Sequence, residues 1–162
     1  MATRHNMEFL AIDTDANLVA RARTHDNRIF YGDATQIELL RRCGIRNARA
    51  LVVTMDTPEA VELVVRAARC ERPDLTIVAR ARDAAHATKL YELKVTDAVP
   101  ETLEASLQLS EAVLIDVGVP MGLVIASIHE KRDEFRHMFQ TGNESVHSRH
   151  AIRRREVRPD PS

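Results

Sequence analysis

The sequence predicts a doubly wound α/β fold, in which parallel strands alternate with helices. Short runs of β-branched, aliphatic and aromatic residues recur between Glu8 and Pro100, and segments with apolar residues at helical spacing separate them. The connections between these segments are short, as expected for right-handed crossovers between parallel strands. No fold class other than a doubly wound parallel sheet fits this alternation well.

The strands are predicted from short apolar runs bounded by turn residues. The expected strands are residues 7–12, 29–31, 50–55, 75–79 and 97–100. The run I-F-Y at 29–31 combines β-branched and aromatic residues and is expected to be buried. The run A-L-V-V-T-M at 50–55 is nearly continuous, which is typical of a strand buried on both faces. Because helices connect the strands, neighbouring strands should be parallel.

The helices among these strands are predicted from apolar residues at helical spacing and from residues suited to helix ends. The expected helices are residues 17–25, 36–43, 58–72 and 84–93. Gly32 lets the chain turn without a Cβ clash after the second strand, and Thr35 is placed to cap the helix that stops at Gly44. Thr57 and Asp83 are the expected N-caps of the last two helices.

The chain changes character after Pro100. Residues 102–117 and 121–139 carry apolar residues at helical spacing, and a Gly-Val-Pro break separates them, so two helices are expected to leave the sheet. Beyond Thr141 few residues could join a core. We therefore expect an α/β domain (1–100), two helices that leave the sheet (101–140) and a disordered tail (141–162).

Composition restricts the classes of partner. The formal net charge is -1 at pH 7, so no overall positive field favours binding to nucleic acid. No apolar run approaches the roughly 20 residues needed to cross a bilayer, and the first residues lack a signal-peptide core, which predicts a soluble chain. Cys43 and Cys70 lack CxxC spacing, which favours reduced thiols in the cytosol over a disulfide or a zinc site. The histidines also lack convincing metal-ligand spacing.

The phosphate-binding loop expected of a nucleotide-binding sheet is missing from the sequence. Such a sheet usually opens with a strand, a G-x-G-x-x-G turn and a helix, and an acidic residue follows about 20 residues later. Asp13 is placed to be that acid, but only twelve residues precede it and the first glycine is Gly32. We therefore predict a Rossmann-like sheet without its first βα unit. The missing strand is normally central, so strands 7–12 and 50–55 should have unpaired edges that pair with each other or with a second chain.

Motifs in a fixed order make the sequence recognisable. They are D-T-D at 13–15, F-Y-G-D-A-T at 30–35, A-R-A-R-D at 79–83 and P-E-T-L-E-A at 100–105. Together they resemble the nucleotide-binding domain called TrkA-N, KTN or RCK, the regulator of potassium conductance. The resemblance is strongest to the cytoplasmic regulatory domain of glutathione-regulated potassium efflux (Kef) systems, and it extends over residues 8–139.

The resemblance implies a ligand-sensing regulatory domain rather than an enzyme. In that family a nucleotide such as NAD(H) or AMP lies across the strand ends, and in Kef-like members glutathione or its adducts bind near the subunit interface. The helix after P-E-T would cross over to a second copy and form a homodimer. The dimer would gate a potassium transporter whose membrane domain lies on another segment or chain, and this domain would be cytoplasmic.

The resemblance also implies a set of nucleotide-binding residues. They are Asp13, Asp15, Gly32, Asp33, Ala34, Thr35, Thr54, Met55, Asp56, Arg80 and Arg82. Asp13 would hold ribose hydroxyls, Asp33 would flank the adenine, and the two arginines would contact anionic groups. Structural alternatives are a helix cap for Asp13, an Asx-turn for Asp33 and surface ion pairs for the arginines. Without the glycine-rich loop, we expect the site to be incomplete.

No catalytic or metal-binding residues are predicted, because no nucleophile has a base beside it in a recognisable motif. The alternative function is a fragment of an NAD-dependent Rossmann oxidoreductase. Such an enzyme would need a substrate domain with its own acid or base after Pro100. Residues 100–139 are too few for that domain, so the sequence favours the regulatory function.

Overall fold

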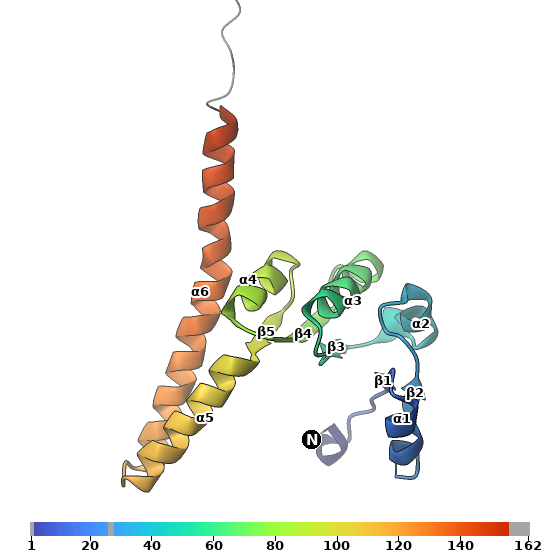
Figure 1. Ribbon diagram of the computed structural model, residues 1–162, viewed down its shortest axis with the longest axis horizontal. Coiled ribbons are helices and arrows are strands. Elements are labelled where there is room, and N and C mark those ends of the chain that lie inside the picture. Colours follow the sequence, from blue (N-terminus) through green and yellow to red (C-terminus); the bar gives the residue numbers. More distant parts are fainter. Residues whose placement is uncertain (1, 26–27, 156–162) are drawn as a thin grey trace, which may run out of the picture.

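The secondary structure in the computed structural model, which describes residues 2–25 and 28–155, follows the predicted alternation (Figure 1). The strands are β1 (Ala11–Asp13), β2 (Ile29–Tyr31), β3 (Ala50–Val53), β4 (Thr76–Ala81) and β5 (Asp97–Pro100). The α-helices are α1 (Ala16–Arg23), α2 (Ile37–Arg42), α3 (Pro58–Glu71), α4 (Ala84–Glu92), α5 (Glu101–Asp116) and α6 (Met121–Arg155). Short 3₁₀ helices are η1 (Ala2–His5) and η2 (Ile45–Asn47). The predicted α/β class is confirmed.

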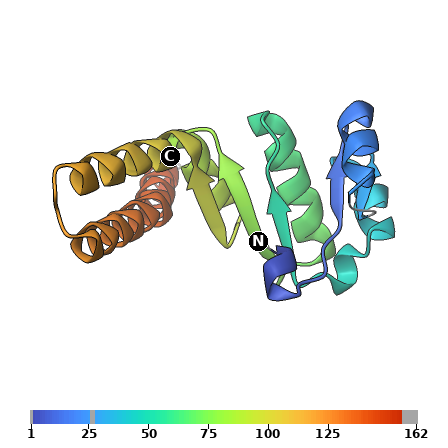
Figure 2. The same cartoon turned by 90° about the horizontal axis from the view of Figure 1, so that it is seen from below.

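The described strands form two parallel sheets rather than one. β1 pairs with β2, and β4 lies between β3 and β5 in the second sheet. Figure 2 shows the β1–β2 pair on the side of β3 that faces away from β4. Among the described residues no ladder joins β1 to β3, so the prediction that these edges pair with each other was wrong. Side-chain packing connects the β1–β2 unit instead, because Ile12 and Ala34 pack against the main hydrophobic cluster, which includes Leu40 of α2 as well as residues of the second sheet.

The strands beside this interruption are less buried than the sequence predicts. Val52 of β3 is 65% exposed and Tyr31 of β2 is 64% exposed. No described strand pairs with the outer edge of β3, and Figure 1 shows α3 and α4 together on one face of its sheet. The predictions that 29–31 is a buried strand and that 50–55 is buried on both faces were therefore wrong. An apolar side chain becomes buried only where another element of the fold covers it.

The hydrophobic core lies between the β3–β4–β5 sheet and helices α3 and α4. Val61, Val64 and Val65 recur at helical spacing on α3, and each is at most 1% exposed. Ile77 of β4 and Leu90 of α4 are completely buried in the same cluster. Each such side chain contributes about 1.5–3 kcal/mol relative to an exposed position. This layer fixes the carboxyl ends of β3, β4 and β5.

Several helix ends follow the predicted signals. Asp83 caps α4, because its carboxylate accepts the His86 N–H at 2.9 Å. Gly44 follows α2 with φ of 83°, in the left-handed conformation that glycine adopts without a Cβ penalty. Thr57 occupies the N-cap position of α3 but makes no side-chain capping hydrogen bond. The helix starts and stops were therefore predicted better than the hydrogen bonds that stabilise them.

Helices α5 and α6 form a hairpin that leaves the sheet, as Figure 1 shows. Leu107 of α5 and Val124 and Ile128 of α6 form a small apolar core within this hairpin. α6 continues to Arg155, so residues 141–155, which were predicted as a disordered tail, are helical. That stretch contains no proline and a single glycine, so little in its backbone chemistry ends the helix at Phe139. Residues 156–162 of the predicted tail lie outside the described residues.

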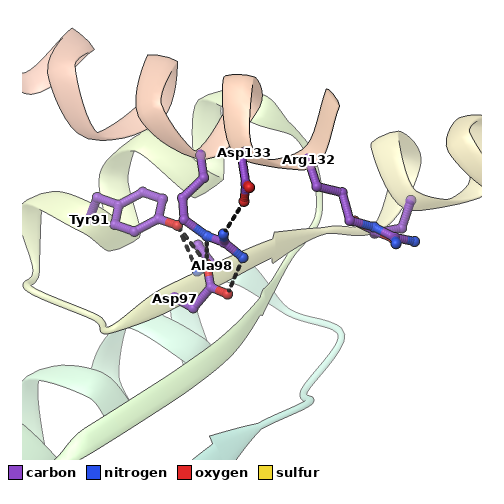
Figure 3. A network of polar contacts seen from close by, with 7 residues as sticks. Tyr91, Asp97, Ala98, Arg132 and Asp133 are labelled. Atoms are coloured by element: carbon purple, nitrogen blue, oxygen red, sulfur yellow. Dashed lines mark hydrogen bonds and ion pairs between the residues drawn. The ribbon is translucent and has the colours of Figure 1, made fainter. Parts of the chain in front are cut away.

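A polar network fastens α6 to the amino end of β5 (Figure 3). Arg136 donates through Nε and Nη2 to the two carboxylate oxygens of Asp97, at 3.1 and 3.0 Å, and through Nη1 to Asp133 at 2.7 Å. The Tyr91 hydroxyl donates to Asp97 at 2.7 Å and accepts the Ala98 N–H at 3.3 Å. Burial is the main cause that raises the pKa of Tyr91, so its hydroxyl keeps the proton that it donates. The network links α4, β5 and α6.

Candidate functional site

The predicted site residues all lie at or just after the carboxyl ends of strands. They follow β1, β2 and β3, or lie at the end of β4, and each strand is parallel to its neighbour. Parallel strands of a doubly wound sheet place their carboxyl ends at one edge, where ligands bind in such folds. In each of the two sheets these residues therefore lie at the carboxyl edge, and that both groups form one binding site stays a prediction.

Asp13 and Asp15 shape the turn between β1 and α1. The Asp13 carboxylate accepts the Asp15 N–H at 2.8 Å, and the Asp13 carbonyl accepts the Gly32 N–H at 2.9 Å. Asp15 caps α1, because its carboxylate accepts the N–H groups of Asn17 and Leu18 at 2.8 and 3.1 Å. The capping role considered for Asp13 therefore belongs to Asp15. Ribose binding by Asp13 stays a prediction.

Asp33 forms an Asx-turn after β2. Its Oδ1 accepts the hydroxyl of Thr35 at 2.7 Å and the N–H of Thr35 at 2.9 Å. These hydrogen bonds, that of the hydroxyl above all, lower the pKa of Asp33 and keep it anionic. The prediction that Thr35 caps α2 was wrong, because the hydroxyl is engaged by Asp33 and the N-cap position is Gln36. The structural alternative for Asp33 is thus present, and its exposed carboxylate still lies at the strand end.

Gly32 allows α2 to approach the end of β2. Among the described glycines only Gly44 and Gly118 have a positive φ, so the backbone dihedral of Gly32 does not require glycine. A Cβ at Gly32 would lie 2.5 Å from Cδ2 of Leu39, which is closer than real Cβ contacts come. The predicted need to avoid a Cβ clash therefore arises from a helix packed nearby. Ala34 is partly buried against the main core in the same turn.

An ion pair between Arg80 and Asp56 joins the ends of β4 and β3. The Arg80 guanidinium also lies 3.9 Å from Oε2 of Glu101 at the start of α5. The Asp56 side chain is 95% exposed, whereas that of Arg80 is 30% exposed. Thr54 is exposed beside this pair, and Met55 is partly buried against the core. Arg80 thus has the ion pairs of its structural alternative, and ligand binding by it stays a prediction.

Arg82 lies beyond the end of β4 and contacts the cap of α4. Its Nε lies 3.2 Å from Oδ2 of Asp83, and its side chain is 67% exposed. Its backbone N–H donates to Nδ1 of His86 at 3.2 Å. The hydrogen bond from the His86 N–H is the main cause that lowers the pKa of Asp83, and Arg82 contributes to the same shift. This arrangement ties Arg82 to α4, whereas Arg80 is tied to β3 and α5.

A surface pocket that the sequence did not predict lies beside Arg80. It measures about 480 Å³, and its polar lining consists of Arg80, Glu101, Glu104, Gln108, Glu111 and Arg132. Arg132 of α6 forms a bidentate pair with Glu104, with Nη2 and Oε2 2.8 Å apart. The lining residues of α5 recur at a spacing that places them on one helix face. The spacing of these polar residues on α5 is visible in the sequence, but only the packing of α6 against α5 shows that they line a pocket.

Other features of the described residues bear on the class of site. No group of three or more His, Cys, Asp or Glu side chains in the described part of the chain is placed to hold a metal ion. Cys43 and Cys70 are free, and burial raises the pKa of the Cys43 thiol. None of the described helices combines the length and the apolar character needed to span a bilayer.

Parallel strands, crossover helices and charged residues at the carboxyl edge define a Rossmann-like domain. The match to a family is specific. The chain matches the TrkA-N domain over residues 1–101, and it belongs to the TrkA-N family. The family predicted from the motifs is thereby confirmed.

Curated relatives of this chain include potassium efflux antiporters. The chain is 33% identical over 129 residues to the putative K(+) efflux antiporter KefB of Alkalimonas amylolytica, an alignment that covers 80% of this chain and 20% of the relative. It is 36% identical over 124 residues to the chloroplastic K(+) efflux antiporter 2 of Arabidopsis thaliana, which covers 76% of this chain and 11% of the relative. The chain therefore spans a fifth or less of the length of these relatives.

Solved structures with the same fold include ligand-bound proteins. The Kef C-terminal domain of Shewanella denitrificans, in an AMP-bound form, superposes with a TM-score of 0.64 at 25% identity and covers 82% of this chain and 94% of that one. The GsuK channel bound to NAD gives a TM-score of 0.63 at 24% identity, and the alignment covers 73% of this chain and 21% of that one. The second likeness supports the fold only. Both agree with the Rossmann-like class predicted from the sequence.

Proposed function

We propose that this chain is a regulatory, nucleotide-sensing domain of a potassium efflux or antiport system. The observation that carries the proposal is the set of charged residues at the carboxyl ends of parallel strands, in a TrkA-N chain whose relatives include K(+) efflux antiporters. The chain spans a fifth or less of those relatives, so the membrane domain would lie on another segment or chain. The domain would act from the cytoplasmic side.

The proposed ligand is a nucleotide, either AMP or NAD(H). Asp13 would accept ribose hydroxyls, and Asp33, which is held anionic by Thr35, would accept hydrogen bonds near the adenine. Arg80 and Arg82 would exchange their carboxylate partners for phosphate oxygens, which suit the guanidinium fork. Glutathione is the proposed second regulator, bound near α5 and α6. Support for AMP comes from the AMP-bound form of the Kef domain.

The proposed site needs a further strand and a glycine-rich turn. β1 and β3 each present an edge that no described strand pairs with, and in a doubly wound sheet the strand at that place carries the phosphate-binding turn. A βα unit inserted there would pair both edges and could also cover Val52 on β3. The unit could come from a further segment of the polypeptide or from a second chain.

A homodimer is the proposed assembly, and α5 carries the surface that supports it. Leu109, Val113 and Val117 are 70%, 59% and 71% exposed and recur every four residues on one face of α5 or at its end. Val113→Lys should convert a dimer into a monomer in sedimentation equilibrium. Glu130→Lys, which changes charge at an exposed position on α6, should leave the dimer intact. A monomeric wild-type chain would contradict the proposal.

Sensing rather than catalysis is proposed because α5 and α6 follow Pro100 in the described chain. The oxidoreductase alternative needs a substrate domain there, and no observation in the described residues favours it. Incubation with NADH should therefore leave the cofactor unchanged. The measurement is its absorbance over the time of a binding experiment.

Calorimetric titration tests the ligand directly. NAD(H), AMP and glutathione are titrated into this chain and into a version extended upstream by a strand and a G-x-G-x-x-G turn. We expect the extended protein to bind a nucleotide much more tightly than the chain alone, and Asp13→Asn to weaken that binding. Glu130→Gln serves as the matched exposed control. Absence of nucleotide binding by the extended, folded protein would refute the sensor function.

A further inference from the structure

His86 joins helix α4 to the end of strand β4 by two reciprocal hydrogen bonds. Its backbone N–H donates to Oδ1 of Asp83 at 2.9 Å, and its ring Nδ1 accepts the backbone N–H of Arg82 at 3.2 Å. The pattern is that of a capping box, in which a side chain in the first helical turn reaches back to a backbone N–H before the helix. Here an imidazole takes the place of the usual Glu or Gln.

This hydrogen bond requires a neutral ring. Nδ1 can accept only while it carries no proton, so the single proton of the neutral imidazole lies on Nε2. His86 is 6% exposed, and its Nε2 is buried without a hydrogen-bond partner among the described residues. A buried polar atom without a partner is unfavourable, so burial of the Nε2 N–H lowers the stability of the folded chain. A purely structural cap would be served equally well by Gln, which does not titrate.

The charged groups around the ring belong to α3 and to the β4–α4 segment. They are Glu62 on α3, Arg82 and Asp83 before α4, and Lys89 on α4. Burial is the main cause that lowers the pKa of His86, and it outweighs the attraction of Glu62 and Asp83. Glu62 is 13% exposed and is paired with Lys89, with Oε1 and Nζ 2.7 Å apart. A carboxylate therefore lies near the ring but is occupied while the ring is neutral.

We propose that His86 is a proton-operated positioning residue, which fixes the turn between β4 and α4, and with it Arg82, only while its imidazole is neutral. A proton taken from solvent onto Nδ1 removes the lone pair that accepts the Arg82 N–H. It also places a cation at the positive end of the α4 dipole. The protonated ring then has two N–H donors, and one of them would bind the Glu62 carboxylate, which would leave its ion pair with Lys89. These are two discrete arrangements, as a switch requires.

The pH window follows from the two states of the ring. An unfolded histidine titrates near pH 6.5, and the pKa of His86 in the fold lies lower. The unfolded chain therefore binds more protons in the interval between these values. The contribution of the neutral ring is complete above about pH 6.5 and is lost as the pH falls through the lower, folded pKa. Mild acidification should thus loosen the turn before the rest of the sheet responds.

The consequence for ligands rests on the proposed function. If Arg82 contacts an anionic group of a nucleotide, acidification would weaken that contact, because loss of the Arg82 N–H hydrogen bond to His86 would let the backbone of Arg82 move. The coupling between His86 and Arg82 does not depend on any ligand. It can therefore be tested on the chain without nucleotide.

The test is a pH titration by NMR of the full chain without ligand, from about pH 7.5 to about pH 5.5. The ring of His86 and the amide of Arg82 are followed together in the same spectra. We expect His86 to titrate below the value of an unfolded histidine, and the Arg82 amide shift to follow the same midpoint. Hydrogen-exchange protection of the Arg82 amide should fall about fivefold across that midpoint.

Variants separate the switch from a merely structural cap. His86→Gln should keep the Arg82 amide protected and make it independent of pH, whereas His129→Gln should behave as wild type. Glu62→Gln, which does not alter the cap, should move the His86 midpoint to lower pH, and the exposed Glu59→Gln should not. An Arg82 amide that ignores the titration of His86 would overturn the proposal. So would a pH response that persists in His86→Gln; if that variant does not fold, an unchanged His86 midpoint in Glu62→Gln decides against it.

Discussion

Replacing Arg136 with methionine tests whether a polar link holds α6 against the sheet. The guanidinium donates to both carboxylate oxygens of Asp97 at the start of β5, and Asp97 also accepts the Tyr91 hydroxyl (Figure 3). Methionine keeps an unbranched apolar side chain and removes every donor. Stacking of Phe135 and Phe139, which contact the main core from α6, should survive the change.

We expect Arg136→Met to lower the free energy of unfolding by about 1 kcal/mol. Hydrogen bonds to charged groups contribute about 1.5–3 kcal/mol when they are shielded from water, and exposed ion pairs contribute about 0.2–1 kcal/mol. The Arg136 and Asp97 side chains are 43% and 28% exposed, so their pair lies between these limits. In a double-mutant cycle with Asp97→Asn, the coupling energy should also be about 1 kcal/mol.

Urea unfolding followed by circular dichroism measures both quantities at a fixed protein concentration. The matched control is Glu134→Gln, which breaks an exposed pair with Lys131 on the same helix, where the side chains are 54% and 51% exposed. That change should cost about 0.3 kcal/mol. If the Arg136–Asp97 coupling is no larger than this control value, apolar packing alone attaches α6 and the reasoning is refuted.

Three further substitutions test the core, a close approach and an acid-sensitive ion pair. Leu90→Ala, at a fully buried position, should cost about 3 kcal/mol in urea unfolding, whereas Leu63→Ala, at a position 55% exposed, should cost under about 1 kcal/mol. Gly32→Ala should cost about 1 kcal/mol because Leu39 must move, and a Leu39→Ala background should remove that cost; an equal cost in both backgrounds would contradict the clash. The hydrogen bond from Arg41 is the main cause that lowers the pKa of Glu71, so its stabilising contribution is present above about pH 4.3 and is lost as the pH falls through the lower, folded pKa. Glu71→Gln should make the urea midpoint depend less on pH over this acid range. If the variant and the wild type show the same dependence on pH, the Arg41–Glu71 pair does not cause the acid sensitivity.

Local features of the fold could be predicted because their causes lie within a few residues. The α3 valines, the Asp83 cap and the left-handed Gly44 each depend on spacing or on a single residue type. The helix cap predicted at Thr35 was wrong because Asp33 accepts both the N–H and the hydroxyl of Thr35, and α2 begins only after Gln36. The end predicted for α6 failed because polar composition was treated as disorder, although few residues in that stretch oppose a helix.

The sequence predicts where the candidate site residues lie along the strands but not which residues they contact. The motifs place Asp13, Asp33 and the two arginines at strand ends, and the structure has them there. The acidic partners of Arg80 come from distant parts of the chain, because it reaches Asp56 after β3 and Glu101 on α5. The pocket beside Arg80 and the link between His86 and Arg82 also required the packed structure.

The strand–helix alternation and the TrkA-N motifs can be recognised from the sequence alone. These follow from local periodicity and from residue identity, which folding does not change. Only the packed structure shows that β1–β2 and β3–β4–β5 are separate sheets, which apolar residues of the strands stay exposed and which acids Arg80 contacts. These depend on strand neighbours and on contacts between residues far apart in the chain, and a local pattern does not specify such neighbours.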